Sequence, residues 1–115
     1  MPRPRLSNPA EEVVEKVLEK MAEAGAISGF FRNRPNDRLD EEGMDFLIIL
    51  KNKLALPLQV KTANRRESCE DKFRKHKKKH PLVNFLICVP VGLLASDSER
   101  VYREVERDLK SMINA

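Results

Sequence analysis

The sequence contains no tryptophan and few other aromatic residues, namely five phenylalanines and one tyrosine. Proteins that bind single-stranded nucleic acids by stacking the bases depend on exposed aromatic rings. The composition therefore argues against an OB-fold or RRM type of binding protein. A glycine-rich phosphate loop, a Ser-His-Asp arrangement and a CxxC pair are also missing, so the sequence has no signature of a P-loop protein, a serine hydrolase or a CxxC redox protein.

Long hydrophobic runs and closely spaced cysteines are missing as well. No apolar run approaches the roughly 20 residues that a membrane-spanning helix needs. The first residues, 1–6, are not followed by an apolar stretch, so we predict no secretory signal. Cys69 and Cys88 stand in unlike contexts without a paired spacing. We therefore expect two reduced thiols in a cytoplasmic protein.

The chain has the size and composition of one small domain. It has 115 residues, of which 41% are apolar, which is enough for one modest core. Residues 1–8 contain two prolines and two arginines and are expected to form a flexible arm. We expect residues 9–115 to form a single domain.

Positive charge is concentrated in one segment. Residues 61–80 contain nine Lys or Arg and three acids, a net charge of +6, whereas the whole chain carries +4. Such a concentration is typical of a surface that binds the phosphate backbone of a nucleic acid, although a solvated helix face is the alternative. The nucleic-acid contacts are expected from Arg65, Arg66, Lys72, Lys75, Lys78 and Lys79.

The order of elements predicts an α/β protein. Helices are expected over about 9–24 and 65–79, and a last helix, capped by Ser96 or Asp97, is expected to end at about Ile113. Strands are expected over 27–31, 44–50, 54–62 and 83–89. Pro57 cannot donate a hydrogen bond within a sheet, so we expect a bulge or a locally unpaired side of the third strand there.

The second and third strands are predicted to form a hairpin around the turn 51–53. If Asn52 is the apex, the numbers of paired residues sum to 104, and Asp45 lies opposite Gln59. Because side chains alternate between the faces of a strand, Gln59 and Lys61 share a face. The hairpin therefore predicts a patch that contains Asp45, Gln59 and Lys61, although polar residues at strand ends are a common alternative.

Glu11 is the acid of the first helix that lies closest to the apolar stripe around Met21. Glu12, Glu19 and Glu23 point away from this stripe on a helical wheel, and Glu15 is intermediate. Glu11 is therefore a candidate to face the sheet, although a helix acid that extends to solvent from the boundary of the stripe is the more common case.

The order of these motifs resembles the PD-(D/E)XK nuclease superfamily, which includes archaeal Holliday-junction resolvases and many restriction endonucleases. The resemblance covers roughly residues 9–90 and is carried by the helix acid Glu11, by the strand around Asp45 and by Gln59-Val60-Lys61. It implies a restriction-endonuclease-like αβββαβ core, with a mixed sheet flanked by helices and a C-terminal helix. It also implies a homodimer that acts on DNA.

The same resemblance implies a site for Mg²⁺ or Mn²⁺. Asp45 would be the chief metal ligand, Gln59 would occupy the position of the second motif acid, and Glu11 would be an accessory acid. Lys61 would be the catalytic lysine. The residue types suit phosphodiester hydrolysis, because Mg²⁺ prefers oxygen ligands and a lysine can stabilise charge on the phosphate.

Gln59 departs from the family pattern, because an amide supplies a neutral oxygen where the motif has a carboxylate. A carboxylate from elsewhere could compensate, and the candidates are Asp40, Glu41, Glu42, Glu67 and Glu70. A second departure is Met44, which stands where the family motif has proline.

Two other functions remain open from the sequence. One is a catalytically inactive DNA-binding module of the same fold, which Gln59 favours. The other is a small protein-interaction domain whose basic helix meets an acidic partner. A zinc site formed by Cys69, His76 and His80 has a suitable i, i+4 histidine spacing, but Phe73 in the middle of that stripe favours ordinary packing.

Overall fold

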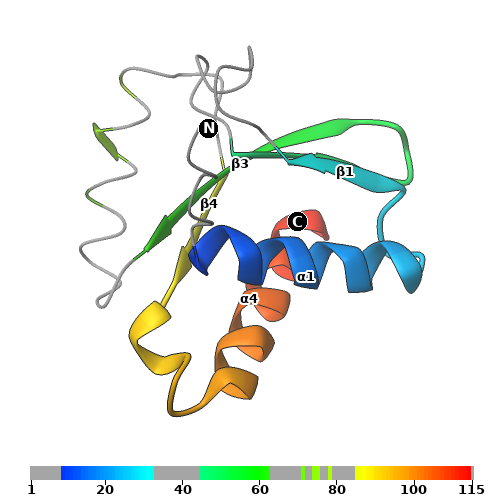
Figure 1. Ribbon diagram of the computed structural model, residues 1–115. Helices are drawn as coiled ribbons and strands as arrows, with labels where there is room; N and C mark the ends of the chain where they lie inside the picture. Colours follow the sequence, from blue (N-terminus) through cyan, green and yellow to red (C-terminus); the bar gives the residue numbers. More distant parts are fainter. Residues whose placement is uncertain are drawn as a thin grey trace, which may run out of the picture.

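The computed structural model describes residues 9–32, 45–62 and 85–114, together with Asp71, Arg74, Lys75 and Lys78. These residues form an α/β structure with a four-stranded mixed sheet and two longer helices (Figure 1). The expected arm 1–8 and most of the expected helix 65–79 lie outside the described residues. None of the described helices has the length and apolar character to cross a bilayer.

The first helix, α1 (Pro9–Glu23), agrees with the prediction to within one residue. Proline is favourable in the first turn, because the backbone N–H groups there have no intrahelical acceptor and its lack of an N–H costs no hydrogen bond. Gly25 ends the helix with a positive φ of 79°, a conformation that glycine adopts without steric cost. The backbone N–H of Ala26 donates to the carbonyl oxygen of Met21 at 2.9 Å, which satisfies one of the last helical carbonyls.

The sheet has the strand order β1-β2-β3-β4. The strands are β1 (Gly29–Arg32), β2 (Phe46–Ile49), β3 (Ala55–Thr62) and β4 (Phe85–Val89). The first three strands are antiparallel, whereas β4 runs parallel to β3. β1 begins two residues later and ends one residue later than the strand predicted over 27–31. Ile27 is buried in the core, although it precedes the paired part of the strand.

Pro57 is accommodated at the beginning of the parallel pairing. The β3–β4 ladder starts with Leu58 opposite Phe85 and continues toward Thr62. Among the described residues, Pro57 pairs with Leu47 of β2. Asn84, which precedes Phe85, lies outside the described residues, so a bulge or a locally unpaired side at Pro57 stays a prediction.

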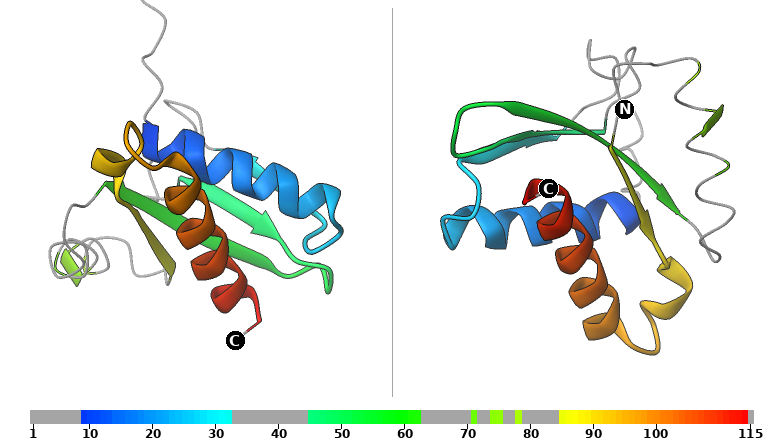
Figure 2. Two further views of the ribbon diagram at one scale, coloured as in Figure 1. Left: turned by 90° about the horizontal axis from the view of Figure 1, so that it is seen from below. Right: turned by 180° about the vertical axis from the view of Figure 1, so that it is seen from behind.

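Both helices cover the same face of the sheet, as the views in Figure 2 show. The chain leaves β4 through the short 3₁₀ helix η1 (Val91–Leu93) and enters α4 (Ser98–Ile113). Asp97 caps α4, since its side chain accepts a hydrogen bond from the backbone N–H of Arg100 at 3.2 Å. Of the two residues that the sequence offered as caps, Asp97 has this role.

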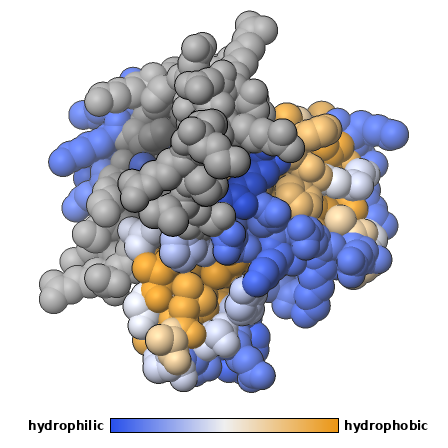
Figure 3. Space-filling model, viewed as in Figure 1, coloured by the Kyte–Doolittle hydropathy of each residue, from blue (hydrophilic) through white to orange (hydrophobic). Residues whose placement is uncertain are grey.

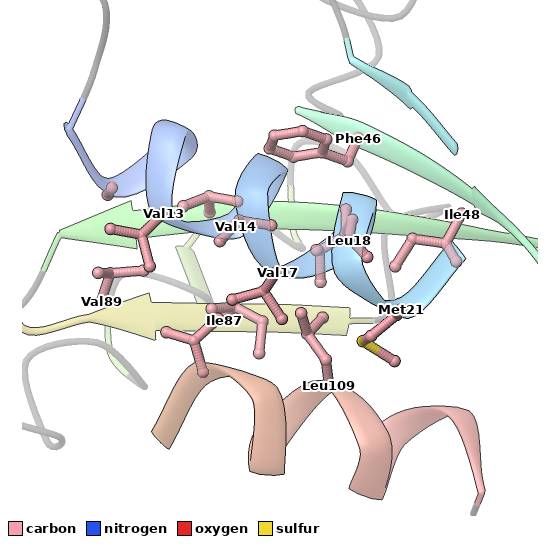
Figure 4. Close-up of a cluster of buried hydrophobic side chains, with 14 of the residues drawn as sticks. Val13, Val14, Val17, Leu18, Met21, Phe46, Ile48, Ile87, Val89 and Leu109 are labelled. Atoms are coloured by element: carbon pink, nitrogen blue, oxygen red, sulfur yellow. The ribbon is translucent and has the colours of Figure 1, made fainter. Parts of the chain in front are cut away.

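The core lies between this face of the sheet and the two helices (Figure 4). Its members include Val13, Val14, Val17, Leu18 and Met21 of α1, Phe46 and Ile48 of β2, Ile87 and Val89 of β4, and Leu109 of α4. Burial of each of these side chains contributes about 1.5–3 kcal/mol to stability before entropy is subtracted. The core holds both helices against the sheet.

The sheet also carries exposed apolar side chains. Phe31 of β1 and Leu54, next to the hairpin turn, are more than half exposed. Figure 3 shows an apolar area over this part of the sheet, on the right of the view.

The expectation of two reduced thiols is wrong, because Cys88 of β4 is disulfide-bonded. The chain has one other cysteine, Cys69, which lies outside the described residues. A separation along the chain does not limit the approach of two cysteines in a folded protein, because only the distance and direction of their side chains matter. Since disulfides are rare in the cytosol, the expectation of a cytoplasmic protein loses the support it drew from reduced thiols.

Candidate metal centre

Asp45 lies immediately before β2 and is held by two hydrogen bonds to β3. Its backbone N–H donates to the carbonyl oxygen of Leu58 at 2.9 Å, and its Oδ2 accepts from the backbone N–H of Val60 at 2.7 Å. The β2–β3 pairing runs from Phe46–Leu58 to Ile49–Ala55, so the pair numbers sum to 104 as predicted. This register places Asp45 at the level of Gln59.

The carboxylate of Asp45 has a structural task in this position. Val60 lies beyond the last backbone pair between β2 and β3, Phe46 with Leu58. The Asp45 side chain therefore supplies the acceptor for the Val60 N–H that the backbone of β2 does not provide. The bond fixes the orientation of the carboxylate, and its charge makes the bond stronger than a neutral one.

Gln59 is one of two buried polar residues in the described part of the chain, with 7% of its surface exposed. Leu58 and Val60 point into the core, so the alternation along β3 places Gln59 and Lys61 on the other face of the sheet. The Nε2 of Gln59 donates to the carbonyl oxygen of Val60 at 3.5 Å. Within the described residues, no hydrogen bond to its Oε1 is recorded.

An amide oxygen that is buried without a donor costs about 1–3 kcal/mol. A cation, a water molecule or a donor group at Oε1 would remove this cost. An amide oxygen can serve as an oxygen ligand of a divalent metal, although it brings no charge to a site.

Lys61 lies two residues beyond Gln59 on the same strand and is partly exposed. It pairs with Cys88 in the parallel ladder. Among the described residues it forms no ion pair.

Glu11 faces inward as the helical wheel predicted, with 8% of its surface exposed. Glu12, Glu19 and Glu23 are exposed and Glu15 is intermediate, also as predicted. The partner of Glu11 is Arg32 of β1, whose Nη2 lies 4.0 Å from Oε1. Within the part of the chain that the structure describes, no hydrogen bond reaches the Glu11 carboxylate.

Arg32 was not identified from the sequence. Its Nη1 donates a hydrogen bond to Oε2 of Glu15, and its guanidinium carbon lies 6.0 Å from the centre of the Phe46 ring. Arg32 thus joins two acids of α1 to the end of β1. The signal for this role in the sequence is weak, because 17 residues separate Arg32 from Glu15.

The structure brings Asp45, Gln59 and Lys61 to one end of the β2–β3 pair. Glu11 belongs to α1, which covers the face of the sheet opposite to Gln59 and Lys61. Its charged partner is Arg32. The convergence of Glu11 with the other three is therefore not confirmed. Across 9–32, 45–62 and 85–114 and the four isolated residues, no group of three or more His, Cys, Asp or Glu could hold a metal.

The carboxylates that could compensate for Gln59 all lie outside the described residues: Asp40, Glu41, Glu42, Glu67 and Glu70. The zinc candidates Cys69, His76 and His80 lie outside them too. Of the proposed ligands, Asp45 and Glu11 each offer a carboxylate and Gln59 offers an amide oxygen.

Of the expected nucleic-acid contacts, Lys75 and Lys78 are described, and both are helical and exposed. The neighbouring Arg74 forms a 3.7 Å ion pair with Asp71, and both side chains are mostly exposed. Such a surface pair contributes little to stability, so it leaves Arg74 accessible to other anions. Arg65, Arg66, Lys72 and Lys79 lie outside the described residues.

In comparisons with known proteins, no family model, no curated protein and no solved structure matches this chain.

Proposed function

We propose that the chain is a metal-dependent endonuclease-like protein with a restriction-endonuclease-like fold, which hydrolyses phosphodiester bonds in duplex or branched DNA. The observation that carries this proposal is the register of the β2–β3 hairpin. It places Asp45 at the level of Gln59, and Lys61 follows on the same face of β3. The order of helices and strands and the mixed sheet support the fold assignment.

In this proposal, Asp45 and the Oε1 of Gln59 would hold Mg²⁺ or Mn²⁺, whereas Glu11 would stay paired with Arg32. A bound divalent metal lowers the pKa of a water molecule and shields charge that develops on the phosphate. The hydrogen bond from Val60 keeps the Asp45 carboxylate in one orientation. The Lys61 ammonium group stabilises the negative charge of the phosphate in the transition state.

Cleavage of plasmid and branched DNA in the presence of Mg²⁺ or Mn²⁺ tests this proposal. We expect nicking by the wild type, and we expect Asp45→Ala and Lys61→Ala to lose it. Lys53→Ala, at the opposite end of the hairpin, is a matched control and should cleave like the wild type. The proposal is wrong if the wild type does not cleave, or if the first two variants cleave as it does.

A catalytically inactive DNA-binding module of the same fold is the second candidate. Gln59 brings no charge to the site, and Glu11 is already paired with Arg32, so both observations favour weak metal binding. This candidate predicts a salt-sensitive shift of DNA in a gel without metal-dependent cleavage.

A further inference from the structure

The disulfide of Cys88 lies beside Lys61 on the sheet. Cys88 is opposite Lys61 in the parallel β3–β4 ladder, and it is partly exposed. Its neighbours Ile87 and Val89 belong to the core beneath α1 and α4. Because side chains alternate along a strand, Cys88 lies on the other face of the sheet, together with Lys61. The disulfide therefore ties another part of the chain to the sheet next to a lysine.

The chain before Cys88 carries most of the excess positive charge. Residues 69–88 contain six Lys or Arg and two acids, and hence a net charge of +4. Three of these cations are described, and all three are helical and exposed: Arg74, Lys75 and Lys78. They are called the basic helix segment below. Cys69 is the only other cysteine of the chain, so it is the one candidate within the same chain for the partner of Cys88.

The length of the connecting chain limits how far the basic helix segment can move from the sheet. Arg74 is twelve residues from Thr62 at the end of β3 and eleven from Phe85 at the start of β4, which allows up to about 40 Å of extended chain. A link between Cys69 and Cys88 leaves five residues of chain before Arg74, or up to about 18 Å. Such a link roughly halves the reach of Arg74.

We infer that Cys88 is joined to Cys69 and that this disulfide holds the basic helix segment close to Lys61. The four cations then form one surface for the phosphate backbone of DNA, which is bound by Lys and Arg side chains. Reduction releases the basic helix segment from Lys61, so the DNA affinity depends on the redox state of the protein. This inference rests on the DNA binding of the proposed function and not on its metal site.

The redox step needs a dithiol as the reductant. A thiolate of the dithiol attacks one sulfur of the disulfide, the S–S bond of the protein breaks, and a mixed disulfide forms. The second thiol of the reductant then displaces the protein sulfur from the mixed disulfide. Two electrons and two protons pass to the protein, which gains two thiols, and the dithiol becomes a cyclic disulfide.

The size of the effect follows from the length of the free chain. The effective concentration of a tethered group falls with about the −3/2 power of the length of its tether. Reduction makes the tether of Arg74 about twice as long, so the DNA affinity should fall by about threefold. Thiols are mainly protonated at pH 7, so a change in net charge does not cause this loss.

Peptide mapping of the oxidised protein tests the pairing of the cysteines without DNA. Trypsin cleaves after Lys and Arg, so it should release residues 67–72 and 80–100 as one disulfide-linked pair that a dithiol separates. Two linked copies of residues 80–100 would place the disulfide between two chains and overturn the inference. Free thiols at both cysteines would overturn it as well.

Fluorescence anisotropy with a short DNA duplex tests the effect on binding. The oxidised wild type should bind about threefold more tightly than the dithiol-treated protein. Cys69→Ser and Cys88→Ser are the matched controls: both should bind like the reduced wild type, with or without dithiol. Equal affinities of the oxidised and reduced wild type overturn this inference alone. The absence of DNA binding in both states overturns the DNA binding of the proposed function together with the inference.

A redox cycle of the wild type covers the case in which the serine variants do not fold. After reduction, a small-molecule disulfide should restore the higher DNA affinity, as it is itself reduced to two thiols. The far-UV circular dichroism should stay nearly constant through the cycle, because α1, α4 and the core do not contain the disulfide. Loss of the circular dichroism on reduction would show that the disulfide maintains the whole fold, and would overturn the inference.

Discussion

At the scale of single residues, Asp45 combines two tasks that can be separated by substitution. Its Oδ2 accepts the hydrogen bond of the Val60 N–H, and its negative charge is what the proposed metal site requires. Asparagine retains an acceptor oxygen of similar position but lacks the charge. Alanine removes both.

We therefore predict that Asp45→Ala lowers the free energy of unfolding by about 1–3 kcal/mol, because the Val60 N–H loses its acceptor. Asp45→Asn should lose clearly less. Urea denaturation without metal measures both values. Equal losses in the two variants would show that the hydrogen bond to Val60 is not the stabilising interaction.

Several residue positions could be predicted from the sequence. The symmetric turn around Asn52 gave the correct register, and the helical wheel correctly assigned Glu11 to the inner side of α1. Both predictions depend on local periodicity. Arg32 could not be predicted, because its contacts with Glu11 and Glu15 depend on how α1 packs against β1.

At the scale of elements, the cap of α4 is a local interaction with a defined energy. Asp97→Ala should lower the free energy of unfolding by about 1 kcal/mol, because the Arg100 N–H loses its side-chain acceptor. Ser96→Ala is the control: the Ser96 hydroxyl donates a long, exposed hydrogen bond of 3.4 Å to Leu93, and its loss should have little effect. Thermal denaturation of both variants measures the difference. A larger loss for Ser96→Ala would contradict the cap assignment.

The elements themselves were largely predictable, for identifiable reasons. α1 and α4 have long amphipathic patterns with clear end signals, and the hairpin has a compact polar turn. The start of β1 was less predictable, because Ile27 and Phe30 are both apolar although β1 begins between them at Gly29. The disulfide at Cys88 was missed, because the spacing of cysteines carries no information about which segments meet in space.

At the scale of the whole molecule, the order of elements predicted the α/β class and a helix at each end of the sheet region, and the mixed sheet was implied by the family resemblance. The order β1-β2-β3-β4 follows from the two antiparallel connections and one crossover to the parallel β4. The asymmetric distribution of charge is also a property of the whole chain, and it leads to a prediction about DNA binding.

If the six nominated basic residues each contact a phosphate, the logarithm of the DNA affinity should fall against the logarithm of the salt concentration with a slope of about −5. The double variant Lys75→Ala/Lys78→Ala should reduce this slope by about 2. Lys51→Ala/Lys53→Ala, at the hairpin turn, is the control with equal charge removal and should retain the wild-type slope. Fluorescence anisotropy over a range of salt concentrations measures it. Equal effects of the two double variants would contradict a localised basic surface.

A Mn²⁺ titration of three proteins tests most directly whether Asp45 and Gln59 hold a divalent metal. We predict that the wild type binds Mn²⁺, that Asp45→Asn binds at least about tenfold more weakly, and that Gln59→Glu binds about fivefold more tightly or better, since each change alters one ligand charge. Circular dichroism confirms that all three proteins are folded. Equal Mn²⁺ affinities in the three folded proteins would contradict the account.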